Sequence, residues 1–291
     1  MRYTGSLYRP PSEADSLILQ ATLGCSYNQC TFCGMYRDKP FRVRPLAELE
    51  AEIEWARRHL PGVRKIFLAD GDALVAKASF LEALLDRLAA AFPALRRVSV
   101  YASPQSLQLR TVEEMARLRG KGLTLYYLGV ESGDDATLAA LRKGVDGAEM
   151  VAAAAKATAA GVKLSTMILL GAGGRARWRE HARGSARVIN AIQPRFLSTL
   201  VMTPVPGTPL AEEAAAGRWR EPDPLETARE LREFLAGLDL RGTIFRSNHA
   251  SNWLALAGTL PKDRPALLAL LDRVLADPAA AVFRPGFMRG L

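Results

Sequence analysis

Short apolar segments alternate with amphipathic stretches along most of this 291-residue chain. Six of the apolar segments are rich in Leu, Ile, Val, Phe or Tyr, and most of them are nearly continuously apolar, which is typical of strands buried on both faces. The segments predicted as strands are Ser16–Leu23, Arg64–Ala69, Arg97–Ala102, Thr124–Val130, Lys163–Leu170 and Phe196–Met202. Because helical patterns separate them, the order of elements predicts repeated βα units.

The stretches between the predicted strands carry apolar residues at helical spacing. Two sets show this spacing: Leu49, Ile53, Ala56 and Leu60, and then Leu81, Leu84, Leu85 and Leu88. Start signals for helices agree with it. Thr111–Glu114 reads as a capping box, and Asp223–Glu226 supplies an N-cap, a proline at N1 and a glutamate at N3. Asp134 or Asp135 is predicted as a further N-cap.

Polar residues and turn glycines follow all six predicted strands. Six βα units fit either an open doubly wound sheet or a partial barrel, and in both the active site lies at the carboxyl ends of the strands. The segments at these ends are Cys25–Cys33, Asp70–Asp72, Ser103, Glu131–Gly133, Gly171–Gly174 and Thr203–Pro209. We expect them to meet at one edge of the sheet.

All three cysteines lie in the first of these segments, at Cys25, Cys30 and Cys33. Three thiolates on one loop suit an iron–sulfur cluster. In a [4Fe–4S] cluster, three protein ligands leave one iron open to another ligand, and this distinguishes a catalytic cluster from an electron carrier. A structural zinc site would need a fourth ligand near the cysteines, but the nearest histidine is His59. A disulfide with one spare thiol would need an oxidising compartment, and the N-terminal residues lack the apolar segment of a signal peptide.

Charge and hydropathy limit the remaining classes of function. No apolar run reaches the length of a membrane span, so we expect a cytoplasmic protein. The net charge of +9 invites a nucleic-acid interpretation. However, the arginines are spread along the helical patterns instead of forming one block, with the densest stretch at Gly174–Arg183. A small-molecule substrate is therefore favoured over a nucleic acid.

Taken together, these motifs resemble the radical S-adenosylmethionine (radical SAM) superfamily over about residues 15–250. Members typically carry C-x₃-C-x-Φ-C after the first strand of a partial (β/α)₆ barrel, and Phe32 occupies the aromatic position before Cys33. The spacing here, C-x₄-C-x₂-C, is one residue longer. Three later segments resemble motifs of the group that includes oxygen-independent coproporphyrinogen oxidases and Elongator-type enzymes: Leu128–Gly144, Leu170–Gly174 and Pro204–Leu210.

The resemblance implies an α/β fold, a partial (β/α)₆ TIM-like barrel over residues 1–240 with a C-terminal extension over 241–291. It implies an oxygen-sensitive [4Fe–4S] cluster held by Cys25, Cys30 and Cys33. SAM would bind the open iron through its amino and carboxylate groups and be cleaved reductively to a 5′-deoxyadenosyl radical. The electron would come from a flavodoxin- or ferredoxin-like donor.

The same resemblance assigns the residues that hold SAM. The Asp70–Gly71–Asp72 turn would accept hydrogen bonds from the ammonium group, Lys143 would meet the carboxylate, and Glu131 would accept from the ribose. The adenine pocket would use Phe32, Met167, Gly171 and Met202, and Ser103 completes the predicted cofactor site. Simple structural roles compete with these assignments. Asp-Gly is a common turn dipeptide, a lysine before a glycine suits a helix C-terminus, and methionines often fill cores.

A polar segment after the apolar run Thr243–Phe245 contains the predicted substrate-side residues Arg246, Asn248 and His249. A loop-pinning role is the alternative for this segment. His59 is predicted at the surface, and His181 within a helix. The absence of a fourth cysteine disfavours members with an auxiliary cluster. The remaining alternatives are an RNA- or protein-modifying radical SAM enzyme and a non-catalytic iron–sulfur or haem carrier of the same fold.

Overall fold

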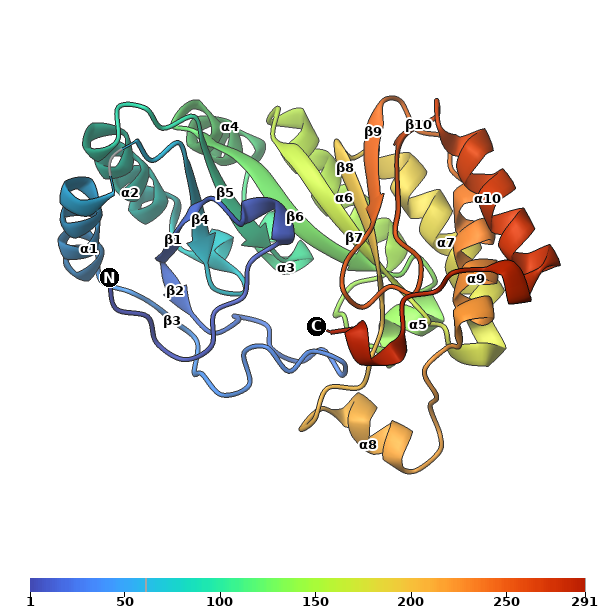
Figure 1. Ribbon diagram of the computed structural model, residues 1–291. Coiled ribbons are helices and arrows are strands. Elements are labelled where there is room, and N and C mark those ends of the chain that lie inside the picture. Colours follow the sequence, from blue (N-terminus) through green and yellow to red (C-terminus); the bar gives the residue numbers. More distant parts are fainter. Residues whose placement is uncertain (61, 291) are drawn as a thin grey trace. The chain divides into compact units, whose positions relative to one another are not determined.

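A computed structural model describes residues 1–60 and 62–290 and contains eight strands in one mostly parallel sheet (Figure 1). The strands follow one another in the order β1-β4-β5-β6-β7-β8-β9-β10. Their bounds are β1 Leu17–Gln20, β4 Lys65–Ala69, β5 Arg97–Ala102, β6 Leu123–Glu131, β7 Lys163–Leu170, β8 Phe196–Val201, β9 Thr243–Ser247 and β10 Leu256–Leu260. A sheet in which each strand lies beside the next along the chain is the topology of a β/α barrel. The predicted fold class is confirmed.

Helices connect the strands at nearly every step. Their bounds are α1 Leu46–His59, α2 Ala78–Ala91, α3 Pro104–Leu109, α4 Val112–Gly120, α5 Asp135–Ala140, α6 Gly147–Ala159, α7 Gly174–Ile192, α8 Pro209–Ala215, α9 Pro224–Ala236 and α10 Arg264–Ala276. Short 3₁₀ turns occur at Pro11–Glu13, Ala73–Val75, Pro278–Ala280 and Gly286–Met288. The predicted caps are confirmed, since Thr111 and Asp223 each form a reciprocal capping box and Asp134 caps α5.

One of the six predicted strands needs correction. The segment Ser16–Leu23 does not form one strand: β1 ends at Gln20, and β2 (Thr22–Leu23) pairs instead with β3 (Arg42–Val43) in a separate two-stranded sheet. The residues after 240 add two strands to the main sheet. β9 runs parallel to β8, and β10 runs antiparallel to β9. The proposed domain division at residue 240 remains a prediction.

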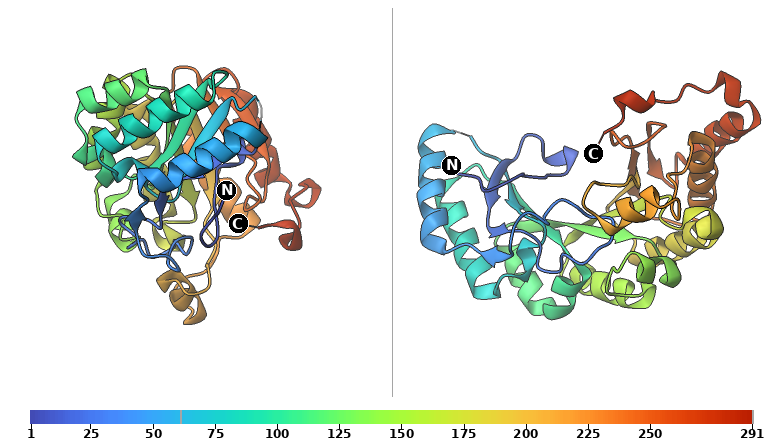
Figure 2. Two further views of the ribbon diagram at one scale, coloured as in Figure 1. Left: turned by 90° about the vertical axis from the view of Figure 1, so that its left-hand side faces the viewer. Right: turned by 90° about the horizontal axis from the view of Figure 1, so that it is seen from below.

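The chain forms two compact units. Unit 1 comprises residues 1–28, 35–128 and 153–164, and unit 2 comprises residues 29–34, 129–152 and 165–291. In each, helices cover one face of the strands (Figure 2). The core of unit 1 packs the β4 residues Ile66 and Leu68 and the α2 residues Leu84 and Leu88, all of which are fully buried. The cysteine segment changes from unit 1 to unit 2 between Asn28 and Gln29.

The uncovered face of the strands in unit 2 is recognisable from alternating burial. Along β8, Leu197, Thr199 and Val201 are buried, whereas Phe196 and Ser198 remain half-exposed. Alternate residues of a strand point to opposite faces, so the second set lies on the face away from the helices. Among the helices of the described chain, none combines the length and apolar character needed to cross a membrane.

Candidate active site

The first end of the cysteine segment is anchored to the turn that follows β4. The amide of Gly24 donates to Asp70 Oδ2 at 3.1 Å. On the other side of Cys25, Ser26 Oγ donates to Asp72 Oδ2 at 2.6 Å. The two neighbours of Cys25 are therefore both fixed to the Asp70–Asp72 turn, and the half-buried thiol is held beside it.

Asp70 is fully buried and is neutralised by a lysine. Lys39 Nζ lies 2.8 Å from Asp70 Oδ2, and the lysine side chain is only 4% exposed. Gln20 on β1 donates to the same oxygen at 3.0 Å. The other oxygen, Oδ1, is buried and has no hydrogen-bond partner within residues 1–60 and 62–290. Asp70 thus joins β1, the end of β4 and the chain after the cysteines.

Asp72 is equally buried, but its hydrogen-bond partners in the described chain are neutral. Its carboxylate accepts from Ser26 Oγ, from Ser103 Oγ at 2.7 Å and from the Ser103 amide at 3.1 Å. Burial raises the pKa of Asp72, although these hydrogen bonds oppose the shift. Ser103 also caps α3. A buried carboxylate without a counter-charge gains most from a cationic ligand.

Gly71 allows the backbone of this turn to approach its neighbours closely. Its amide donates to the Gly24 carbonyl at 3.1 Å. A Cβ atom at position 71 would lie 2.6 Å from the Tyr36 ring and 2.9 Å from Cys25 Cβ. Because these distances are below normal contact, only glycine fits between Tyr36 and Cys25 without movement.

The second end of the cysteine segment, Cys30–Cys33, is anchored within unit 2. The Thr31 amide donates to the carbonyl of Leu141 at 3.0 Å, and the Thr31 carbonyl accepts from the amide of Leu210 at 3.0 Å. Leu141 lies two residues before Lys143. The backbone bonding therefore brings the second and third cysteines to the loop that carries Lys143.

Lys143 and Glu131 form a buried ion pair. Lys143 Nζ lies 3.1 Å from Glu131 Oε1, and each side chain is 10% exposed. Burial alone would lower the pKa of Lys143, but the negative charges of Glu131, Cys30 and Cys33 outweigh it and raise that pKa. The ammonium carries three donors and the carboxylate two acceptor oxygens.

The backbone at the end of β6 is shaped around this pair. Glu131 has a φ of 66°, which is uncommon for a residue other than glycine and clusters at functional sites. The Glu131 carboxylate folds back over Gly129, where a Cβ would collide with Glu131 Oε1 and lie 3.2 Å from Lys143 Nζ. The Gly-Val-Glu sequence is thus explained by the space that the ion pair needs.

A buried polar chain links the loops after β6 and β7. Ser132 Oγ accepts from the Asp134 amide at 3.0 Å and lies 2.8 Å from His181 Nδ1, to which it can donate. His181 Nε2 lies 3.3 Å from Glu230 Oε1 without forming a hydrogen bond within the described residues. Glu230 Oε1 also accepts from the Gly171 amide at 2.8 Å. The predicted helical position of His181 is confirmed.

Several predicted adenine-pocket residues lie together in unit 2. Met202 is buried in a cluster with Leu141, Leu169 and Leu210, and Phe32 packs against this cluster. Gly171 lies at the end of the same strand as Leu169, with a φ of 87°. Met167 is half-buried further back on β7, on the face that the helices leave uncovered.

A family model described as the radical SAM superfamily matches residues 19–183, more than half of the chain. The chain belongs to the radical SAM superfamily. Members of this family use SAM and an iron–sulfur cluster and generally need a reductant, and this radical SAM protein is an enzyme. A comparison with curated proteins found no match.

Solved radical SAM structures share the fold of this enzyme. Methylornithine synthase (PylB) matches with a TM-score of 0.57 and 17% identity over 93% of this chain and 74% of its own. Coproporphyrinogen III oxidase (HemN) from Escherichia coli matches with a TM-score of 0.58 and 18% identity, over 76% and 51% of the two chains. Elp3 from Methanocaldococcus infernus gives 0.52 and 15%, over 80% and 59%. This chain therefore spans only 51% of the HemN chain and 59% of the Elp3 chain, and the similarity concerns the fold.

The residues of this radical SAM enzyme fit an iron–sulfur cluster. In the described chain, no three Cys, His, Asp or Glu side chains are arranged to hold a single metal ion. A four-iron cluster does not require such an arrangement, because each thiolate binds a different iron. The cation of Lys143 next to Cys30 and Cys33 favours their thiolate forms, which are the forms that bind iron.

The predicted substrate-side residues lie at the end of β9 and in the loop after it. Arg246 is exposed, and its Nη1 donates to the carbonyl of Phe245 at 2.7 Å. Asn248 is exposed, and His249 Nδ1 lies 2.9 Å from Ser251 Oγ. His59, by contrast, lies at the surface as predicted, where it stacks on Trp55.

Three residues of the site escaped the sequence analysis. Lys39 neutralises Asp70, Ser26 holds Asp72, and Glu230 holds the Gly171 amide. Lys39 and Glu230 act on partners 31 and 59 residues away in the chain, so no local pattern marks them. Ser26 follows the first cysteine directly, and that position was the one available signal.

Proposed function

We propose that this enzyme binds one [4Fe–4S] cluster through Cys25, Cys30 and Cys33 and cleaves SAM reductively. When bound, the cluster would supply the electron that breaks a carbon–sulfur bond of SAM and releases a 5′-deoxyadenosyl radical. The radical would abstract hydrogen from a small-molecule substrate. A flavodoxin- or ferredoxin-like protein would serve as the electron donor.

The anchoring of the cysteine segment is the observation that carries this proposal. Cys25 is held beside the buried carboxylate of Asp72, and Cys30 and Cys33 are held beside the ion pair of Lys143 and Glu131. Each end of the segment thus brings a charged group that could bind SAM next to a thiolate.

The SAM roles follow from the charges of the groups. The ammonium of SAM would be accepted by the Asp70–Asp72 turn, chiefly by Asp72, since Asp70 already has Lys39 as its counter-charge. The carboxylate of SAM would receive a hydrogen bond from Lys143, and a ribose hydroxyl would donate to Glu131. Phe32 and Met202 would contact the adenine, with Gly171 and Met167 beside them.

The substrate would be contacted by Arg246, Asn248 and His249 from the uncovered face of unit 2. One observation supports a small molecule over a nucleic acid. Most arginines of α7 are engaged in ion pairs within the chain: Arg175 with Glu226, Arg177 with Asp134 and Arg183 with Glu233. The excess positive charge is therefore partly neutralised where its density is highest.

Anaerobic reconstitution tests the proposal. We expect about four irons and four sulfides per chain, as a [4Fe–4S] cluster requires. Replacing Cys25, Cys30 or Cys33 by Ala should remove the visible absorption of the cluster and all formation of 5′-deoxyadenosine. SAM should also change the electron paramagnetic resonance spectrum of the reduced protein.

Two results would contradict the proposal. Full iron content in the triple Ala variant would show that other residues bind the cluster. A spectrum that is identical with and without saturating SAM, together with no SAM cleavage, would instead indicate an electron or haem carrier.

A further inference from the structure

The loop that follows β9 is held by the last residues of the chain. Between the end of β9 and the start of β10, residues 248–255 have no strand neighbour, so their backbone groups need other partners. Within the tail, here residues 284–290, Arg284 Nη1 donates to the carbonyls of His249 at 2.6 Å, Ala250 at 2.7 Å and Asn252 at 3.1 Å. One guanidinium thus accounts for three carbonyls of the loop.

The two remaining carbonyls between 249 and 253 also accept hydrogen bonds from the tail. The Arg284 amide donates to the carbonyl of Trp253 at 2.8 Å, and Arg289 Nε donates to the carbonyl of Ser251 at 2.7 Å. The Arg289 guanidinium lies 3.7 Å from the centre of the Trp253 ring and forms an ion pair with Glu221. Every carbonyl from 249 to 253 therefore accepts a hydrogen bond from the tail.

The tail is not held by a hydrophobic core of its own. Phe287 is 88% exposed, Met288 is 61% exposed, and Val282 just before the tail is 91% exposed. Its attachment consists mainly of the hydrogen bonds and the cation–π contact to the loop. The sequence of the tail is therefore best explained by what it does to the loop.

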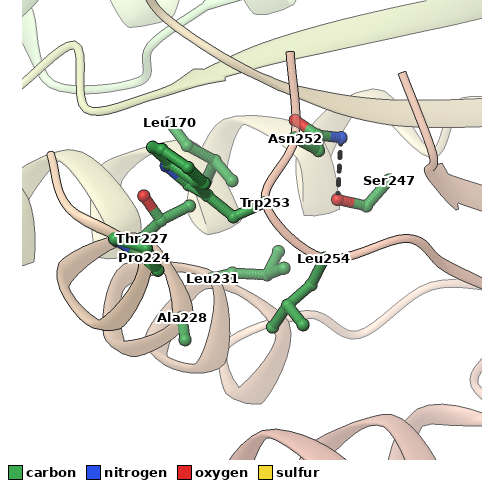
Figure 3. A pocket seen from close by; sticks show the side chains of 9 residues that line it. All are labelled: Leu170, Pro224, Thr227, Ala228, Leu231, Ser247, Asn252, Trp253 and Leu254. Carbon is green, nitrogen blue, oxygen red and sulfur yellow. Dashed lines mark hydrogen bonds between the residues drawn. The ribbon is translucent and has the colours of Figure 1, made fainter. Parts of the chain in front are cut away.

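The opposite side of the loop faces the body of unit 2. Asn252 Nδ2 donates to Ser247 Oγ at 3.1 Å and to the carbonyl of Thr199 at 2.7 Å, and Trp253 closes one side of a small pocket over α9 (Figure 3). Ser251 Oγ accepts from the Val201 amide at 3.1 Å. This side is fixed to β8 and β9, whereas the carbonyl side depends on the tail.

His249 is oriented by this double attachment. Its Nδ1 accepts from the Ser251 amide at 3.1 Å, and its own carbonyl is the nearest acceptor of Arg284. Burial lowers the pKa of His249, and the positive charge of Arg284 lowers it further. The imidazole thus reports directly on whether the tail is docked.

We propose that Arg284 and Arg289 are positioning residues of the substrate site: the tail fixes the 249–253 loop and so sets the orientation of His249 and Asn248. The contact of these two residues with substrate rests on the proposed function above. The docking of the tail and its effect on the loop do not.

Hydrogen–deuterium exchange of the complete protein tests the docking. In Arg284→Ala, the amides of residues 249–254 should exchange about tenfold faster or more, because local opening no longer breaks the bonds to the guanidinium. The exchange rates in Arg284→Lys should lie between those of wild type and Arg284→Ala, because an ammonium offers three donors where the guanidinium offers five. Arg273→Ala, at an exposed arginine of α10, is the matched control and should leave the loop unchanged.

The imidazole of His249 gives a second readout by nuclear magnetic resonance. In Arg284→Ala, the pKa of His249 should rise towards the ordinary value of about 6.5, because a nearby cation is lost and the ring becomes more exposed. Arg284→Lys should keep it lowered. Unchanged exchange and an unchanged His249 pKa in both Arg284→Ala and Arg289→Ala would overturn the proposal. If exchange in Arg284→Ala also became faster in β8, the effect would not be specific to the loop. Arg289→Ala, which loses one carbonyl contact, would then be the test: faster exchange in the 249–253 loop would support the proposal, and unchanged exchange would overturn it.

The substrate side is tested with a small-molecule extract of the source cells. Wild-type enzyme should form more 5′-deoxyadenosine when the extract is added, and Arg284→Ala should lose most of this stimulation. Stimulation equal to wild type in Arg284→Ala would contradict a positioning role. Should wild-type protein fail to cleave SAM at all, the proposed function would be wrong, whereas the exchange experiment would still stand.

Discussion

The two ends of the cysteine segment differ in how their buried carboxylates are paired with cations. At the Cys25 end, in unit 1, two buried carboxylates stand one residue apart, and only Asp70 has a cation, Lys39. At the Cys30–Cys33 end, in unit 2, one carboxylate faces one cation within a buried pair. Among the described residues, the Cys25 end therefore has one buried carboxylate, Asp72, without a paired cation, whereas the buried carboxylate at the Cys30–Cys33 end is paired with Lys143. The difference indicates which groups support the fold and which are available to a charged ligand.

The largest effect is expected at Asp70. Asp70→Asn keeps the volume of the side chain but leaves the ammonium of Lys39 buried without its counter-charge, which should lower the free energy of unfolding by about 3–5 kcal/mol. Thermal unfolding under anaerobic conditions measures this loss. The double variant Lys39→Met/Asp70→Asn is the control. It should recover much of the stability, and a double variant as unstable as the sum of the two single variants would show that the pair is not coupled.

How far the sequence predicts this region depends on how local each interaction is. The strands Arg97–Ala102 and Lys163–Leu170 were predicted with their observed bounds, because each is a short segment rich in apolar residues between two helical patterns. The capping boxes at Thr111 and Asp223 join residues three apart in the chain, and they were predicted from the sequence equally well. The Ser16–Leu23 run was misread because its apolar character continues past the point where pairing with β4 ends and pairing with β3 begins.

Contacts between residues far apart in the chain could not be predicted from the sequence. The sequence indicated that Glu131 and Lys143 both serve the site, but nothing in it showed that they contact each other. The partners of Arg284 lie 31 to 35 residues earlier, in a loop whose polar residues suggested substrate contact or a loop-pinning role but not the partner that holds it. Such contacts depend on the tertiary fold, which the periodicity of single segments does not encode.

The ion pair of unit 2 should affect SAM more than stability. Glu131→Gln retains an acceptor for Lys143, whose charge Cys30 and Cys33 still offset, but it loses a charge-assisted hydrogen bond of roughly 1.5–3 kcal/mol to the ribose. SAM affinity should therefore weaken about 10- to 100-fold, while iron content stays normal. Isothermal titration with the reconstituted protein measures this. The Gln variant is preferred to Ala, because Ala would leave Lys143 buried without a partner. Unchanged affinity would remove Glu131 from the SAM site.

Asp72 should behave differently from Asp70, although both are fully buried. In Asp72→Asn the neutral partners Ser26 and Ser103 can still form hydrogen bonds, so stability near neutral pH should change by about 1 kcal/mol or less. Because the folded pKa is raised, the stability that Asp72 contributes is present below its unfolded pKa of about 3.9 and is lost as the pH rises through the folded pKa.

Without cofactors, Asp72→Asn should therefore become more stable relative to wild type as the pH rises above about 4. Melting curves across pH can show this. Its SAM affinity should nevertheless fall about tenfold or more, because the buried charge for the ammonium is gone. A variant that is strongly destabilised and binds SAM normally would reverse the assignment of the two aspartates.

The smallest effect is expected at an ion pair nearer the surface of unit 2. Arg177 Nη2 lies 2.7 Å from Asp134 Oδ1, and the hydrogen bond from Arg177 is the main reason that the pKa of Asp134 is well below its ordinary value. Asn caps helices about as well as Asp, so Asp134→Asn removes the ion pair but keeps the cap of α5. Since the Arg177 side chain is 44% exposed, the loss at neutral pH should be only about 0.5–1 kcal/mol.

A depressed folded pKa gives stability that is present above the unfolded pKa of about 3.9 and is lost as the pH falls towards the folded pKa. Wild type and Asp134→Asn should therefore differ at pH 7 and converge below about pH 4 or at high salt. A difference that persisted in acid would mean that Asp134 stabilises α5 through its cap, and that the charge contributes nothing.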